Sequence, residues 1–118
     1  MPTPITRVAL QARLASGDSP ILVEALGLAF YADAHIPGAI NIPAGKVDAL
    51  AATLLPDHDA EIVVYCSGTC SSSHAVARRL EQLGYLSVAV YDGGKEDWVE
   101  HGLPLERSAE CCGEDLPA

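Results

Sequence analysis

The chain has 118 residues, 49% of them hydrophobic, which is enough for one domain with a single core and too few for two domains of ordinary size. Seven basic and sixteen acidic residues give a net charge of 7 − 16 = −9 at pH 7, which argues against a nucleic acid or an anionic membrane as partner. The opening MPTPITRVAL lacks the apolar core of a signal peptide, and no apolar run approaches membrane-spanning length, so we expect a cytoplasmic protein.

The apolar pattern changes back and forth between helical spacing and short strand-like runs. In chain order it predicts a helix at 7–15, a strand at 21–26, a short apolar stretch at 39–42, a helix at 46–55, a strand at 62–65, a helix at 72–83, a strand at 86–91 and a short helix at 95–102. Strands that lie between helices indicate an α/β fold, with a mostly parallel sheet of about four to five strands covered by helices on both faces. We expect residues 1–118 to form one domain.

Residues 61–74, EIVVYCSGTCSSSH, hold the clearest chemical signal. Cys66 ends a predicted strand and opens a Gly/Ser loop that leads into a helix, and ligands of an open parallel sheet bind at such strand ends. Backbone N–H groups of the loop and the helix N-terminus can stabilise a thiolate, or an anionic sulfur bonded to it. Cys66 is therefore the candidate nucleophile. The loop residues predicted to hold its anion are Ser67, Gly68, Thr69, Cys70, Ser71 and Ser72, with the Ser71 and Ser72 hydroxyls assisting. The hydroxyls of Ser67 and Ser73 can likewise donate to an anion or cap the helix.

The four cysteines differ in what their surroundings indicate. A buried structural role is the ordinary alternative for Cys66, but the polar loop that follows it fits that role poorly. Cys70 is either a resolving thiol that reacts with Cys66 or a small loop residue without a role. Cys111 and Cys112 lie in an acidic tail at 107–118, which we expect to be flexible, and adjacent cysteines suit tetrahedral zinc badly, so no metal site is predicted. In the cytosol the thiols are expected to be reduced.

Other polar side chains give weaker signals. His35 opens a bend, where hydrogen bonding to the backbone is favoured over a role as general base. His74 lies in the first turn of the helix after the loop, close enough to influence Cys66. Its place near the positive end of the helix dipole favours a neutral ring that faces solvent. Trp98 is predicted to pack in the core, and Arg78 and Arg79 to form a solvated helix face.

Four phrases, in this order, resemble one known family: HIPGAINIP at 35–43, VVYCSG at 63–68, LEQLGY at 80–85 and VYDGGKEDWVEHGLPLE at 90–106. Together they are similar to a single-domain rhodanese, the sulfurtransferase homology domain, in a branch with a second cysteine in the active-site loop. The likeness covers about residues 4–106.

The resemblance implies an α/β sandwich in which Cys66 is the catalytic cysteine. In that family the cysteine takes a sulfane sulfur from a donor such as thiosulfate, becomes a persulfide, and passes the sulfur to a thiol or cyanide-type acceptor. It implies no cofactor. The expected partners are a small-molecule sulfur donor and a thiol acceptor, which includes a thioredoxin-like or sulfur-carrier protein.

The chain departs from the family pattern in three places. The loop at 67–73 has no Arg or Lys to attract thiosulfate, so anion capture rests on N–H groups, hydroxyls and the helix dipole, which contributes about 0.3–1 kcal/mol. Residues 24–26 read Glu-Ala-Leu where many members have Asp-x-Arg, so we expect the ion pairing made by that Asp-x-Arg sequence to be lost. The interval from Cys66 to Gly84 is a residue longer than the commonest one. Weak turnover of thiosulfate is therefore expected.

A second hypothesis is a redox-sensing or sulfur-carrying module in which Cys66 and Cys70 alternate between dithiol and disulfide. It is favoured by the second loop cysteine together with the missing loop cation. A cysteine phosphatase is rejected, because such enzymes need an arginine that closes the loop and grips phosphate in a bidentate way. Ser72 occupies that position here, and Arg78 comes at least a helical turn too late.

Overall fold

A computed structural model describes residues 3–17, 20–26, 31, 33–66 and 72–105. Its five described strands are β1 (Thr3–Pro4), β2 (Ile21–Glu24), β3 (Ile40–Asn41), β4 (Glu61–Tyr65) and β5 (Ser87–Tyr91). They form one sheet in the order β1-β5-β4-β2-β3, with every pair parallel. The described helices are α1 (Arg7–Ala15), the 3₁₀ turn η1 (Ala44–Lys46), α3 (Val47–Leu54), α4 (Ser72–Gln82) and α5 (Gly94–Glu100).

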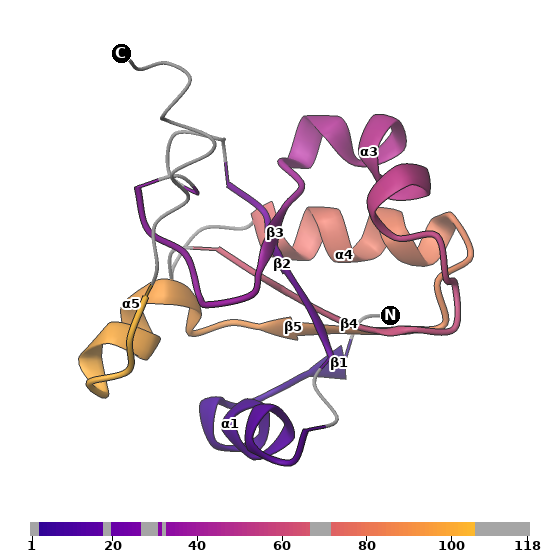
Figure 1. The fold of residues 1–118 in the computed structure, drawn as a ribbon. Helices are drawn as coiled ribbons and strands as arrows, with labels where there is room; N and C mark the ends of the chain where they lie inside the picture. Colours follow the sequence, from indigo (N-terminus) through magenta and orange to yellow (C-terminus); the bar gives the residue numbers. More distant parts are fainter. Residues whose placement is uncertain (1–2, 18–19, 27–30, 32, 67–71, 106–118) are drawn as a thin grey trace.

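Helices cover both faces of this sheet. Figure 1 shows α3 and α4 on one face, α1 on the other, and α5 beyond the end of β5. Parallel strands need crossover connections, and the helices supply them. The predicted α/β fold with a parallel sheet is confirmed.

The two faces of the sheet bury two separate clusters because successive side chains of a strand point in opposite directions. In β4, Ile62 and Val64 face α3 and α4, whereas Val63 and Tyr65 face α1 and α5. The first cluster includes Val23, Ile42, Leu55, Val76, Leu80, Val88 and Val90. The second includes Leu10, Leu22, Ile36, Tyr91 and Trp98. With both faces covered, each residue of β4 after Glu61 is buried.

The predicted helices and the longer strands lie within a few residues of their observed positions. Helix α1 has the predicted bounds; Thr6 caps its first turn by accepting from the Ala9 N–H (3.1 Å), and Gly17 follows its end with φ +84°. Strand β2 ends at Glu24, two residues before the predicted end. Strand β1 was not predicted, because two exposed residues carry no period of their own and pair only through β5.

Among the residues that the structure describes, no helix is long and apolar enough to cross a membrane. The predicted tail at 107–118, with Cys111 and Cys112, lies outside the described residues.

Candidate active site

Cys66 directly follows β4, the central strand of the sheet. Its carbonyl oxygen accepts a hydrogen bond from the Lys95 N–H at the start of α5 (2.9 Å), and the preceding Tyr65 carbonyl accepts from the Ala25 N–H after β2 (2.8 Å). The backbone at Tyr65 and Cys66 is therefore held between the segments that follow the two neighbouring strands, β2 and β5. The predicted position at a strand-to-helix turn, between β4 and α4, is confirmed. This is the edge at which parallel sheets bind ligands.

The sulfur of Cys66 lies against the first turn of α4. Its Sγ is 3.6 Å from the Oγ of Ser73, and both residues are only 1% exposed. A hydroxyl at this position can donate to a thiolate, so Ser73 is the member of the predicted serine run that the structure places beside the sulfur. The other predicted loop residues, Ser67, Gly68, Thr69, Cys70 and Ser71, lie outside the described residues, and Ser72 is half-buried at the first position of α4.

Cys66 is disulfide-bonded in the structure, and its partner lies outside the described residues. The sequence predicted reduced thiols, so the structure differs from the expectation at this residue. A disulfide sulfur cannot act as a nucleophile until it is reduced to the thiolate. Sulfur chemistry at Cys66 therefore requires prior reduction.

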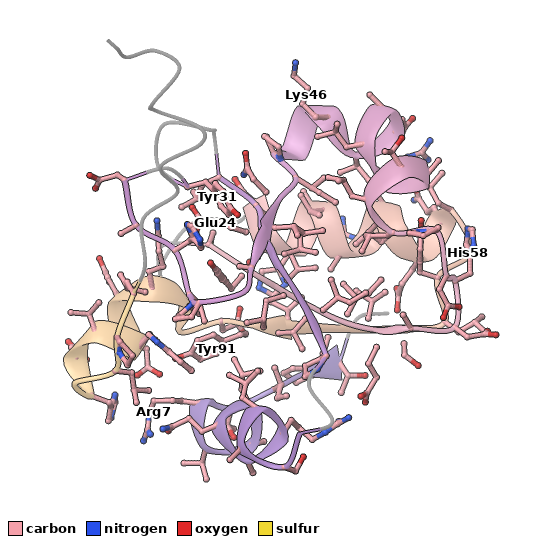
Figure 2. All side chains as sticks on the ribbon, viewed as in Figure 1. Arg7, Glu24, Tyr31, Lys46, His58 and Tyr91 are labelled. Atoms are coloured by element: carbon pink, nitrogen blue, oxygen red, sulfur yellow. The ribbon has the colours of Figure 1, made fainter. Side chains whose placement is uncertain are left out.

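A buried ion pair lies at the same end of the sheet, on the face opposite the Cys66 sulfur. Lys95 Nζ donates to Glu24 Oε2 (3.1 Å) and to the Ala34 carbonyl (2.7 Å). Tyr65 Oη donates to Glu24 Oε1 (2.9 Å) and accepts from the Ile36 N–H (2.9 Å). Figure 2 shows Glu24 and Tyr31 at this end of the sheet, whereas His58 lies at the opposite end. With leucine at position 26 the Asp-x-Arg ion pairing of the family has no counterpart, but Glu24 has a different partner, Lys95, which comes from a distant element.

The protonation of this network follows from its burial. The Glu24 side chain is 0% exposed and that of Lys95 13%. Burial raises the pKa of Glu24 above its ordinary value, although Tyr65 and Lys95 oppose the shift. Burial, together with the nearby Glu24 carboxylate, raises the pKa of Tyr65 far above its ordinary value, so the phenol stays protonated and donates. In the described part of the chain, every buried side-chain nitrogen and oxygen has a hydrogen-bond partner.

The histidines near this edge have different surroundings. His35 is buried and stacks on Tyr31 with ring centroids 4.0 Å apart, and its Nδ1–H donates to the Tyr31 carbonyl (2.7 Å). The predicted backbone hydrogen bond of His35 is confirmed. His74 is exposed, but its Nε2 lies 2.5 Å from Oδ1 of Asp92, the first residue after β5. The ring faces solvent as predicted, and it also has a hydrogen-bond partner, Asp92, that the sequence did not indicate.

The remaining predictions concern packing and surface. Trp98 is buried, donates from Nε1 to the Pro104 carbonyl (2.8 Å) and meets Tyr91 edge-on, so its core role is confirmed. Arg78 is exposed as predicted. Arg79 is half-exposed and forms a bidentate pair with Asp48 of α3 (2.7 and 2.8 Å). The described site residues that sequence reasoning missed are Tyr65, Asp92 and Lys95, each of which owes its position to pairing between distant segments.

A five-stranded parallel sheet with a cysteine at the carboxyl end of its central strand, and with the first turn of a helix packed against the cysteine sulfur, defines an α/β protein with a cysteine-centred site. Residues 6–101 match the family model described as the rhodanese-like domain. The chain belongs to this family.

Comparison with individual proteins agrees with this assignment. The chain is 32% identical over 96 residues to a sulfurtransferase of Allochromatium vinosum, with 81% of this chain and 87% of the relative covered. It is 35% identical over 105 residues to an HTH-type transcriptional regulator of Mycobacterium tuberculosis, covering 89% of this chain and 45% of the relative. Its structure resembles that of a thiosulfate sulfurtransferase from Pseudomonas aeruginosa with a TM-score of 0.80 and 29% identity, over 90% of this chain and 20% of that chain. The chain therefore spans less than half of the regulator and a fifth of the Pseudomonas protein.

Proposed function

We propose that the protein is a rhodanese-type sulfurtransferase in which reduced Cys66 carries the transferred sulfur. The observation that carries the proposal is the position of Cys66 at the carboxyl end of the central strand, with its Sγ 3.6 Å from the Ser73 hydroxyl at the start of α4. Similarity to a sulfurtransferase over most of both chains supports the same activity.

The reaction has two displacement steps. The Cys66 thiolate attacks the outer sulfur of a donor such as thiosulfate, a new S–S bond forms, the S–S bond of the donor breaks, and sulfite leaves with the electron pair. An acceptor thiolate then attacks the outer sulfur of the Cys66 persulfide and releases the Cys66 thiolate. Both forms of Cys66 are anionic. The Ser73 hydroxyl and the positive end of the α4 dipole therefore stabilise each of them.

The donor and acceptor are the finer part of the proposal. Because residues 67–73 contain no Arg or Lys, we infer that a dianion such as thiosulfate binds weakly and that a protein or small-molecule persulfide is the more effective donor. A thiol is the acceptor, carried either by a small molecule or by a thioredoxin-like or sulfur-carrier protein.

The experiment is to weigh the reduced, desalted protein after incubation with thiosulfate or with a small-molecule persulfide. We expect a mass increase of one sulfur atom, which a thiol such as dithiothreitol then removes. Cys66→Ser is expected to gain no sulfur, whereas the control Cys111→Ser/Cys112→Ser gains it as the unmodified chain does. Failure of both donors to add sulfur, or addition that persists in Cys66→Ser, would overturn the proposal.

A second candidate function is redox sensing, and the disulfide at Cys66 favours it. In this reading Cys70 is the partner, and the dithiol and disulfide forms are the two functional states. The test is to count free thiols after mild oxidation of the unmodified chain and of Cys70→Ser. We expect two fewer thiols in the oxidised unmodified chain and no intramolecular disulfide in Cys70→Ser. If the unmodified chain loses no thiols, the redox candidate fails and the sulfurtransferase stands alone.

A further inference from the structure

His74 and Asp92 form a hydrogen-bonded pair that has no part in the two displacement steps described above. His74 is the third residue of α4, Asp92 follows β5, and Nε2 of the ring lies 2.5 Å from the carboxylate Oδ1. Both side chains are exposed. A carboxylate in this position accepts from Nε2–H, which fixes the ring and, in its neutral form, leaves the lone pair on Nδ1.

Two separate structural relations place this pair beside Cys66. In the register of β4 and β5, Tyr65 lies opposite Tyr91, so the next residues, Cys66 and Asp92, are neighbours at the edge of the sheet. Val64 and Val90, each two residues earlier, face α4, so by alternation Cys66 and Asp92 both emerge toward α4. On α4 itself, Ser73 contacts the Cys66 sulfur, and the next residue is His74. Figure 1 shows that α4 begins at this same end of the sheet.

The second half of a sulfur transfer needs a proton acceptor. An alkyl thiol is mostly protonated at neutral pH and must lose its proton to attack a persulfide. We propose that His74, oriented by Asp92, is the general base that takes this proton from the acceptor thiol; the inference rests on the proposed sulfurtransferase function. The acceptor S–H bond breaks and the proton moves to Nδ1 of His74. The acceptor sulfur then bonds to the outer sulfur of the persulfide, the bond from that sulfur to Cys66 Sγ breaks, and Cys66 leaves as the thiolate.

Exposure of the pair fits this role. A base that serves an incoming acceptor must be reachable from solvent and must release its proton again after each turnover, which an exposed ring does. Asp92 holds the imidazole in one orientation through the hydrogen bond to Nε2. The donor half-reaction transfers no proton, since a thiolate attacks thiosulfate and sulfite leaves as an anion. His74 is therefore required only when sulfur leaves Cys66 for a protonated acceptor.

The experiment measures the two half-reactions separately, by mass, on reduced protein. Sulfur is first loaded from an aryl persulfide, whose aryl thiolate leaves without taking up a proton, and the loaded protein is then mixed with an aryl thiol that is ionised at neutral pH or with an alkyl thiol that is not. For His74→Gln we expect unchanged loading, unchanged discharge to the aryl thiol, and discharge to the alkyl thiol that is slower by about a hundredfold, the lower end of general-base contributions. His101→Gln is the matched control, because His101 is also exposed and lies 3.4 Å from a carboxylate oxygen, that of Asp97, and we expect it to discharge both thiols normally.

The outcomes separate this inference from the function on which it rests. If the unmodified chain does not load sulfur, the sulfurtransferase proposal fails and the role of His74 falls with it. If loading occurs but His74→Gln discharges the alkyl thiol at the normal rate, or slows both thiols equally, the general-base inference alone is overturned. Asp92→Asn retains the imidazole and is expected to show the same selective loss, so it carries the test if His74→Gln does not fold.

Discussion

Replacing Lys95 by methionine is expected to lower the free energy of unfolding by about 3–5 kcal/mol at neutral pH, because it leaves a buried carboxylate without its charge partner. The Glu24 side chain is fully buried, and Lys95 is its cationic hydrogen-bond partner (3.1 Å). Methionine keeps most of the length and apolar volume of the lysine stem, so the loss reports charge and hydrogen bonding more than packing. Urea denaturation of the reduced protein and of the reduced variant measures this loss in the free energy of unfolding.

The pH dependence of this loss gives a sharper test. The pKa of Glu24 is raised in the folded protein, so the carboxyl group favours folding most below its ordinary pKa of 4.5 and progressively less as pH rises through its raised folded value. Without Lys95 the folded pKa rises further, so the defect should be small in acid and grow toward neutral pH. Lys46→Met, at an exposed lysine, is the control and should change stability little. A defect that is independent of pH would contradict the buried-pair explanation, as would an equal defect in Lys46→Met.

Replacing Leu80 by alanine is expected to lower the free energy of unfolding by about 2–5 kcal/mol, the range found when a fully buried leucine is truncated. Leu80 is 0% exposed and lies on the face of α4 that packs against the sheet, in the cluster with Val76 and Val88. The same substitution at Leu86, which is 74% exposed, supplies the control and should cost less than about 0.5 kcal/mol. Chemical denaturation of both variants makes the comparison, and similar losses would show that α4 does not pack as described.

Truncation of Leu80 should also affect the site, because the first turn of the same helix holds Ser73 beside Cys66. We expect the Cys66 thiol of Leu80→Ala to react faster with an alkylating reagent, since loosening α4 exposes a sulfur that is only 1% exposed. The rate for Leu86→Ala should equal that of the unmodified chain. Equal alkylation rates in all three proteins would show that access of the reagent to the Cys66 sulfur does not depend on the packing of α4.

The sequence predicted the position of the candidate site because Cys66 lies where two local patterns meet. The run Ile62 to Tyr65 has strand composition, and the spacing of apolar residues from Val76 to Leu83 is helical. Both patterns depend on neighbours in the chain, so they can be read without a structure. The sequence left several serines as candidates to donate a hydrogen bond to the sulfur, and Ser73 was only one of them. The register of α4 against the sheet decides which serine faces the sulfur, and the structure places Ser73 there.

By itself, the sequence determined the order of helices and longer strands and the junction at which Cys66 lies, because hydrophobic periodicity is a short-range property. Only the tertiary structure decided which polar side chains become partners. Glu24 and Lys95 are separated by 71 positions, and His74 and Asp92 by 18. Each pair forms because the carboxyl ends of parallel strands, and the helices next to them, meet at one edge of the sheet. For Glu24, whose side chain is fully buried, burial also requires a counter-charge, whatever the distance of that counter-charge along the chain.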